Sequence, residues 1–155
     1  MSTRLKVPYQ TTVLVRDCCL CLHVQGAARV LARRFDDALR PLDLRNGQFS
    51  LLMSLNRPEP TQMAAVASLL AMDRTTLTAA LKPLERRGLV TVTSDHGDRR
   101  SRLMALTPKG MTLLAKAVPI WKRTHSEIEG RLPDGDSDRL RSDLRALSAA
   151  GKNPS

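Results

Sequence analysis

Small, hydroxyl and cationic side chains follow Asp73 at positions that a helix would place on one exposed face. They are Arg74, Thr75, Thr78, Ala79, Lys82 and Arg86. Leu77, Leu81 and Leu84 take the opposite positions and predict the buried stripe of the same helix. Small hydroxyl side chains at the start of such a helix can approach base edges, and its lysine and arginine can contact phosphates. The segment therefore predicts a helix that binds nucleic acid.

Arg99 and Arg100 stand in a polar turn between two segments that have the composition of β-strands, residues 89–93 and 102–106. Two strands joined in this way predict a hairpin with the arginines near its tip. Arginines at a hairpin tip can enter a minor groove, whose narrow A·T-rich stretches concentrate negative potential. The alternative is a charged tip that contacts only solvent.

Signals for helix ends place the nucleic-acid-binding helix second in a helix-turn-helix. Thr61 has the residue type of an N-cap and precedes a short apolar helix. Asp73 is a second candidate N-cap only a few residues later, and Gly88 has the type of a left-handed C-cap. Two helices joined by so short a turn are typical of a helix-turn-helix, and the hairpin that follows is typical of a wing.

Long helices are predicted on both sides of this unit. Apolar residues recur at three- and four-residue steps over residues 17–42, and a second apolar set widens the face. A helix this apolar must pack on two sides, which indicates a dimer interface. Thr107 and Pro108 have the types of a cap and a first helical residue, and a last helix follows Asp136 or Ser137.

The fold predicted from these elements is mainly α with a small β-hairpin wing. A winged helix-turn-helix DNA-binding domain is expected at residues 45–107. Residues 11–44 and 108–150 are expected to form a helical dimerisation region built from both termini. The chain has 155 residues, which suits such a single small domain with dimerisation helices.

Composition points to a polyanionic partner. The 25 Lys and Arg residues against 15 Asp and Glu give a formal net charge of +10, and a protein this basic usually binds nucleic acid or an anionic membrane. No stretch approaches the ~20 apolar residues of a membrane span, and residues 1–10 lack the apolar run of a secretory signal. Three closely spaced cysteines are not a secreted disulfide framework. We therefore expect a cytoplasmic protein that binds double-stranded DNA and no membrane.

Catalytic motifs are missing from the sequence. It contains no phosphate-binding glycine loop, no carboxylate pair at a fitting spacing and no nucleophile motif. We therefore predict a protein that is not an enzyme and needs no cofactor. Cys18, Cys19 and Cys21 with His23 would point in different directions on a helix, whereas zinc sites prefer spaced pairs, so no metal site is predicted. The rival interpretation is an architectural protein that coats DNA without sequence preference.

The chain resembles the MarR (multiple-antibiotic-resistance regulator) family from about residue 17 to residue 149. The most specific stretch is residues 98–110, where an Asp-x-Arg precedes a Leu-Thr-x-x-Gly, as in the wing signature of that family. Residues 72–78 and 84–90 resemble its recognition helix and the strand that follows. A capping threonine is usual where Arg45 stands, and we expect Asn46 to take over that cap.

The resemblance implies a homodimeric repressor that a small molecule or oxidation releases from an inverted-repeat operator. Half-site centres would then lie about one helical turn apart. Recognition-helix roles fall on five residues: Arg74, Thr75, Thr76, Thr78 and Lys82. In the wing, Arg99 or Arg100 would reach the minor groove while Asp98 braces the hairpin. Whether the protein represses or activates depends on where its site lies relative to the promoter.

Cys21 stands where the organic-hydroperoxide sensors of this family (OhrR-like) place their reactive cysteine. A peroxide sensor needs a thiolate held by hydrogen-bond donors or positive charge. Tyrosines supply such donors in those sensors, but Gln25 and Phe35 occupy the corresponding positions. The alternative is that Cys18, Cys19 and Cys21 are small packing residues of the dimerisation helix. His23 and Trp121 could line the pocket between the dimer helices and the winged domain in which relatives hold aromatic carboxylates, but core packing is the expected role of Trp121.

Overall fold

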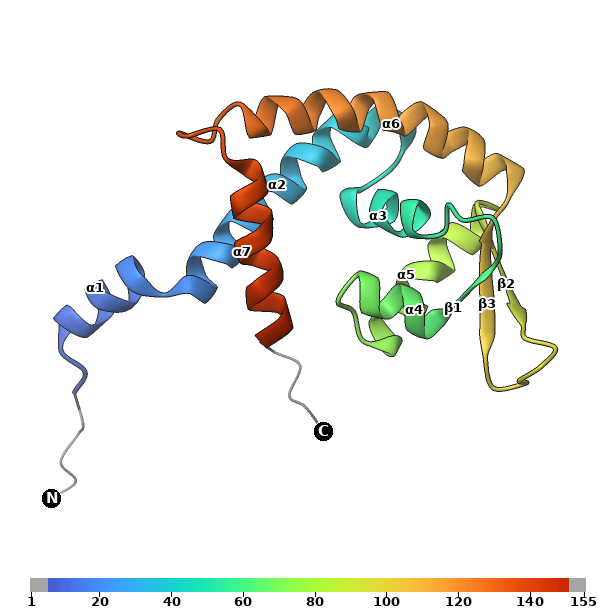
Figure 1. Cartoon of the computed structure of the whole chain (residues 1–155), viewed down its shortest axis with the longest axis horizontal. Helices are drawn as coiled ribbons and strands as arrows, with labels where there is room; N and C mark the ends of the chain where they lie inside the picture. The colour runs from blue at the N-terminus through green and yellow to red at the C-terminus, as the bar shows by residue number, and fades with distance from the viewer. Residues whose placement is uncertain (1–5, 151–155) are drawn as a thin grey trace, which may run out of the picture.

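The computed structural model describes residues 6–150, which form helices around one small sheet. Figure 1 shows the winged domain at one end, helix α6 along the top and the helix α1 projecting at the other end. The elements are α1 (Tyr9–Cys18), α2 (Leu20–Leu39), a 3-10 turn (Arg40–Leu42), α3 (Asn46–Ser54), β1 (Thr61–Gln62), α4 (Met63–Leu69), α5 (Arg74–Arg86), β2 (Val90–Ser94), β3 (Arg102–Leu106), α6 (Pro108–Glu129) and α7 (Ser137–Ala150). The predicted fold class, mainly α with a hairpin wing, is confirmed.

The hydrophobic core lies where α3, α4, α5, the sheet and α6 meet. The leucine stripe predicted for α5 is buried in this core: Leu77, Leu81 and Leu84 are at most 2% exposed. Burial of each such side chain is worth about 2 kcal/mol relative to exposure. Because the stripe anchors one side of α5, the opposite side is held facing solvent.

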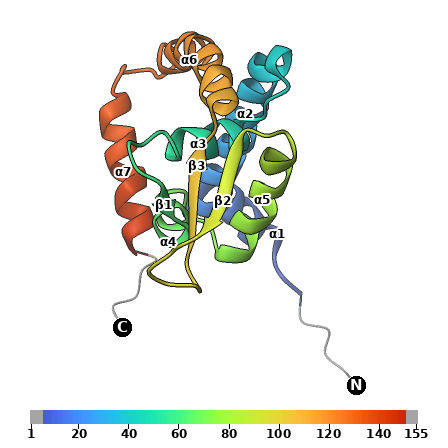
Figure 2. The same cartoon turned by 90° about the vertical axis from the view of Figure 1, so that its right-hand side faces the viewer.

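The sheet contains one strand that the sequence did not predict. Its order is β1-β3-β2 and both pairings are antiparallel. Met104 of β3 pairs with Val92 on one side and with Thr61 on the other. The prediction of Thr61 as an N-cap is therefore wrong, since Thr61 lies buried in β1 and Gln62 takes the N-cap position of α4. Pairing with β3 holds this segment extended. Figure 2 looks onto β2 and β3 as they run down to the wing tip.

The first predicted helix, over residues 17–42, is divided in the structure. Helix α1 already starts at Tyr9, and Cys19 interrupts the helix with an extended backbone (ψ 107°) before α2 begins. The carbonyl of Cys19 accepts the backbone N–H of His23 at 3.2 Å and a second hydrogen bond from Nδ1 of the same residue at 2.8 Å, at the start of α2. Asp43 closes the following 3-10 turn with a positive φ of 51°.

The expected cap at Asn46 is also wrong. Arg45 takes the N-cap position of α3, and its backbone N–H donates to Oε1 of Gln48 at 3.0 Å. The backbone N–H of Asn46 donates to the carboxylate of Asp36 at 2.6 Å. An aspartate from α2 therefore accepts one of the free backbone N–H groups in the first turn of α3.

Helix α6 connects the winged domain to the terminal helices. It packs against α2 and α3, and an ion pair between Arg34 and Glu127 (2.6 Å) ties it to α2. Glu129 near its end pairs with Arg141 of α7 at 2.6 Å, and hydrogen bonds from Arg141 and Ser137 hold the pKa of Glu129 below its usual value. Within residues 6–150, no helix combines the length and apolarity that a membrane crossing requires.

Candidate nucleic-acid interface

The start of α5 is fixed by Asp73, as predicted. Its carboxylate accepts the backbone N–H of Thr76 at 2.7 Å and the hydroxyl of the same residue at 2.9 Å. These bonds, the backbone one first, lower the pKa of Asp73 below its usual 3.8. Gly88 just beyond the helix has a φ of 68°, the left-handed conformation predicted for it. Both ends of the candidate recognition helix are therefore set by local sequence.

A hollow of about 670 Å³ lies between the exposed face of α5 and the wing, and we call it the interface hollow. Four of the predicted recognition residues line it: Arg74, Thr75, Thr78 and Lys82. Arg100 and Arg102 line it from the wing. Glu85 is the one acidic lining residue, against four cations, so the hollow carries net positive charge. Such a surface suits the sugar-phosphate backbone beside a groove.

The three threonines of the recognition helix differ in how free their hydroxyls are. The hydroxyl of Thr76 donates to Asp73, and Thr76 is not among the residues that line the interface hollow. The hydroxyl of Thr78 donates to the carbonyl of Arg74 at 2.8 Å. Of these three threonines, only Thr75 has a hydroxyl that makes no hydrogen bond to the described part of the chain. Thr75 is therefore best placed to bond a base edge, and a base contact by Thr76 stays a prediction.

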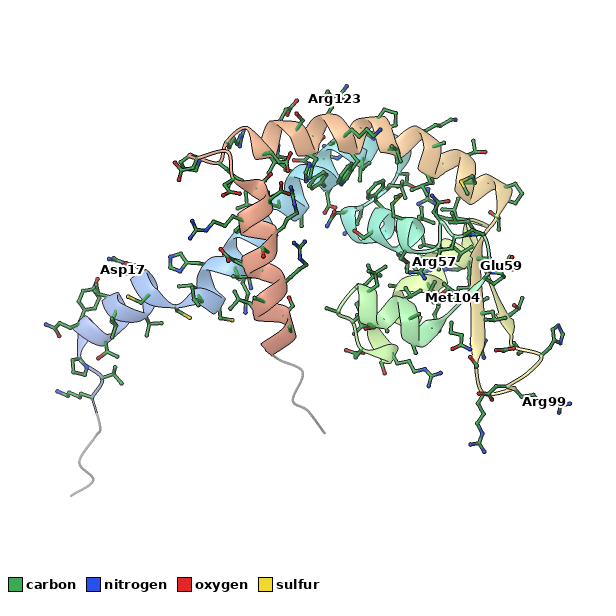
Figure 3. All side chains as sticks on the ribbon, in the orientation of Figure 1. Asp17, Arg57, Glu59, Arg99, Met104 and Arg123 are labelled. Carbon is green, nitrogen blue, oxygen red and sulfur yellow. The ribbon has the colours of Figure 1, made fainter. Side chains whose placement is uncertain are left out.

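The wing tip is ordered by local hydrogen bonds in which its aspartates accept backbone N–H groups. Oδ1 of Asp98 accepts the backbone N–H of Arg100 at 2.9 Å, and Oδ1 of Asp95 accepts that of Gly97 at 2.9 Å. Figure 3 shows Arg99 at the extremity of the wing, pointing away from the body of the protein. Arg99 does not line the interface hollow, whereas Arg100 does. The two arginines thus offer one contact at the tip and one beside α5.

Arg102 is a candidate DNA-contact residue that was not predicted from the sequence, because it was assigned only to a β-strand. Arg102 is the first residue of β3 and follows the turn that holds Arg100, and both side chains line the hollow. The extra strand β1 was not predicted either, although Gln62 reaches across to the carboxylate of Asp95 (3.5 Å) and links the start of α4 to the wing.

The cysteines lie away from the interface hollow, at the junction of α1 and α2. All three are free thiols, with Cys18 and Cys21 exposed and Cys19 half-buried at the helix break. The Sγ atom of Cys21 accepts a hydrogen bond from Nε2 of Gln25 at 3.0 Å. Gln25 therefore supplies a donor at the position where hydroperoxide sensors have a tyrosine.

A second hollow, of about 480 Å³, lies between α3 and α6, and we call it the Trp121 hollow. Phe49, Met53 and Leu69 give it apolar walls, and Lys122 supplies a cation. The indole of Trp121 stacks on Phe49 with ring centroids 6.1 Å apart and on His125 at 4.7 Å. Trp121 is half-buried and packs against the hydrophobic core, which confirms the expected core packing. It also lines this hollow, but His23 is not among the lining residues.

Loss of the Asp73 cap gives a pH-dependent prediction. The folded state lowers the pKa of Asp73, so its stabilising effect is full above the usual value of 3.8 and is lost as the pH falls through the lower folded value. Asp73→Ala is therefore expected to lower the urea midpoint at pH 7, with a difference from the parent that shrinks below pH 3.8. Asp134→Ala, which removes an exposed loop aspartate, is the control and should leave the midpoint unchanged. A difference for Asp73→Ala that is constant from pH 7 to pH 2 would contradict the capping role.

Comparison with known proteins gives one consistent result. The sequence model of the MarR family matches residues 44–101. The organic hydroperoxide resistance transcriptional regulator of Bacillus subtilis is 32% identical over 101 residues, which cover 65% of this chain and 69% of that protein. The crystal structure of M. tuberculosis transcriptional regulator MosR in complex with DNA has a TM-score of 0.78 and 37% identity over 85% of this chain and 95% of that one. CouR, a transcriptional repressor from Rhodococcus jostii RHA1, is similar in its complex with a 23-mer DNA duplex, with a TM-score of 0.76 and 28% identity over 86% and 95% of the two chains.

Proposed function

The chain belongs to the MarR family of DNA-binding transcriptional regulators, and we propose that it is a homodimeric repressor of an inverted-repeat operator. The observation that carries the proposal is the interface hollow, where the exposed face of α5 and the wing present four cations to one space. A regulator of this kind has no need of catalysis, and we infer that the protein is not an enzyme.

Each half of the operator would be read by one winged domain. Arg74, Thr75, Thr78 and Lys82 would enter the major groove, since all four are exposed and line the interface hollow. Arg99 at the tip would enter the minor groove, and Arg100 would lie between the major and the minor groove. Thr76 and Asp98 would act by holding the helix start and the wing tip in shape.

The dimer interface would be formed by residues 11–44 and 108–150, with residues 45–107 free to bind DNA. Large apolar side chains are exposed along the terminal helices: Leu14, Val15, Leu20, Leu22, Val24, Val30, Leu31, Leu140, Leu144 and Leu147. A patch of this extent in a monomeric soluble protein would promote aggregation, and a second copy would bury it. Because α6 joins this region to the wing, the spacing of the two winged domains would follow the packing of the dimer.

Two signals could release the operator, and different observations favour them. The Trp121 hollow has aromatic and apolar walls with Lys122 at hand, which suits a small aromatic carboxylate. Cys21 is exposed and accepts a hydrogen bond from Gln25, a contact that would also stabilise a thiolate. Cys18, Cys19 and His23 lie close by in the chain and could take part in thiol oxidation. We favour the aromatic ligand, because the hollow lies between α3 of the winged domain and α6 of the proposed dimerisation region, where a ligand would contact both.

A gel-shift titration with the promoter region beside the gene tests the proposed function. The reduced protein is expected to shift this DNA at least about 1,000-fold more tightly than a scrambled duplex of the same length. The titration is then repeated after stoichiometric organic hydroperoxide, and separately with salicylate as a probe aromatic carboxylate. Cys21→Ser is the control for oxidation and Trp121→Ala for the ligand.

Each result has one meaning. Release by hydroperoxide that Cys21→Ser abolishes would identify a thiol sensor, and release by salicylate that Trp121→Ala abolishes would identify a ligand-responsive repressor. Equal affinity for the promoter and the scrambled duplex would contradict a sequence-specific repressor and favour an architectural protein.

A further inference from the structure

Helix α6 carries a second group of cations that the proposed DNA interface does not use. Lys109, Lys116 and Arg123 are spaced seven residues apart, so they share one side of the helix about 10 Å from one another along its axis. All three are exposed. Residues 108–126 contain no aspartate or glutamate. We call this side of the helix the α6 flank.

The first half of the flank borders a groove of about 400 Å³. Arg87, Lys109 and Lys116 are its charged lining residues, with Leu89, Thr112 and Leu113 between them. Arg87 is held in place, since its guanidinium donates to the carbonyl of Asp43 at 2.6 Å. Lys109 is held too, because its ammonium donates to the carbonyl of Arg87 at 2.8 Å. Arg87 and Lys109, two of the three cations that line the groove, are therefore held in place by hydrogen bonds to backbone carbonyls.

The α6 flank lies on the opposite side of the protein from the wing tip. In Figures 1 and 2 helix α6 runs along the top, with no described element above it, while the wing tip is at the bottom. Figure 3 shows Arg123 pointing up from α6 and Arg99 at the lower end of the wing. One straight duplex that contacts α5 and the wing therefore leaves the flank free.

The chemistry of the flank favours an extended polyanion. A membrane surface would require a row of large apolar side chains beside the cations, but Met111 is the one large apolar side chain that α6 exposes, and the other exposed residues between the cations are Thr112, Ala115, Pro119 and Lys122. A compact anion would use only the groove, whereas the cations extend about 20 Å along the helix to Arg123. Lysines and arginines placed at regular steps along a stretch of helix, residues 108–126, that contains no aspartate or glutamate suit the phosphates of a nucleic acid backbone. Glu127, the first acidic residue after this stretch, is paired with Arg34.

We propose that the α6 flank binds the backbone of a second DNA duplex, so that one protein dimer bridges two DNA segments. The proposal rests on the proposed function, because the first duplex is the operator held by α5 and the wing. The second contact has no sequence preference, since it uses phosphates alone. It is weaker than operator binding and is lost first as the salt concentration rises.

A two-step capture experiment tests the proposal. Operator duplex is fixed to beads and saturated with protein, the beads are washed, and a fluorescent duplex without operator sequence is added. The variant is Lys116→Gln/Arg123→Gln, which leaves Lys109 and its bond to Arg87 intact. The matched control is Arg139→Gln/Arg145→Gln, which removes two exposed cations from α7. A charge-reversed variant, Lys116→Glu/Arg123→Glu, is measured beside them.

The parent and the control are expected to retain the fluorescent duplex, and the Gln variant about tenfold less of it. The Glu variant should retain none, and all four proteins should bind the operator with similar affinity. Equal retention by the parent and both flank variants, or no retention by the parent, would overturn the second-duplex proposal alone. Capture of phosphatidylserine vesicles in place of the fluorescent duplex would also overturn it. Loss of the first, operator-binding step in the parent would count against the proposed function instead.

Discussion

Arg100→Ala/Arg102→Ala is expected to weaken operator binding by about 100-fold at moderate salt. Both side chains line the interface hollow beside the exposed face of α5. Neither forms an ion pair with the described part of the chain, so their charge is available for phosphates. Fluorescence anisotropy with labelled operator between 50 and 200 mM salt measures the effect, and the salt slope should fall by roughly four for a dimer that places two wings on DNA.

The control for this prediction removes the same charge elsewhere. Arg139→Ala/Arg145→Ala should leave both the affinity and the salt slope near those of the parent, because α7 lies away from the interface hollow. Thr75→Ala gives a second comparison. Loss of a base contact should lower the ratio of the affinity for the operator to the affinity for scrambled DNA, without changing the salt slope. An unchanged slope in the Arg100 and Arg102 double variant would show that the wing does not contact phosphates.

Gly110→Ala is expected to destabilise the folded protein by about 3 kcal/mol. A Cβ atom at Gly110 would lie 2.0 Å from the carbonyl oxygen of Leu89, a backbone atom that cannot rotate away. The same carbonyl accepts the backbone N–H of Thr107 at 3.1 Å, so a shift would break the joint between the sheet and α6. Urea denaturation followed by circular dichroism measures the change, and the thermal midpoint should fall by roughly 10 °C.

Gly47→Ala is the matched control for this substitution. A Cβ at Gly47 meets nothing within 4 Å, and the residue lies inside α3. Alanine there should leave the stability unchanged or raise it by about 0.5 kcal/mol, since it restricts the unfolded chain. Equal stabilities for the Gly110 and Gly47 variants would falsify the close approach between α6 and the Leu89 carbonyl.

Features encoded by neighbouring residues could be predicted from the sequence. Asp73, the leucine stripe of α5 and Gly88 together define one helix, and each acts within a few residues of where it stands. The Thr107 cap and Pro108 at the start of α6 are of the same kind. The exposed face of α5 follows from these local signals, and so does the position of most residues of the interface hollow.

Features that depend on distant partners could not be predicted. Strand β1 is two residues long and exists because β3, more than 40 residues away, pairs with it. The cap of α3 depends on Asp36 from the preceding helix, so the polar residue at Asn46 was given the wrong role. No proline or glycine stands beside Cys19, so the sequence gives no signal for the break between α1 and α2. Arg102 was missed because its strand was interpreted for pairing and not for the side that it presents.

Strand β1 has a consequence for protein engineering. Met104 of β3 pairs with β1 on one side and with β2 on the other, so the base of the wing is held from both sides. The loop between Ser94 and Arg102 lies beyond this pairing and is exposed along most of its length. Loops of this kind tolerate insertions and exchanges that strands do not. A library that varies only this loop would therefore change the side chains that the wing presents while the rest of the scaffold stays folded.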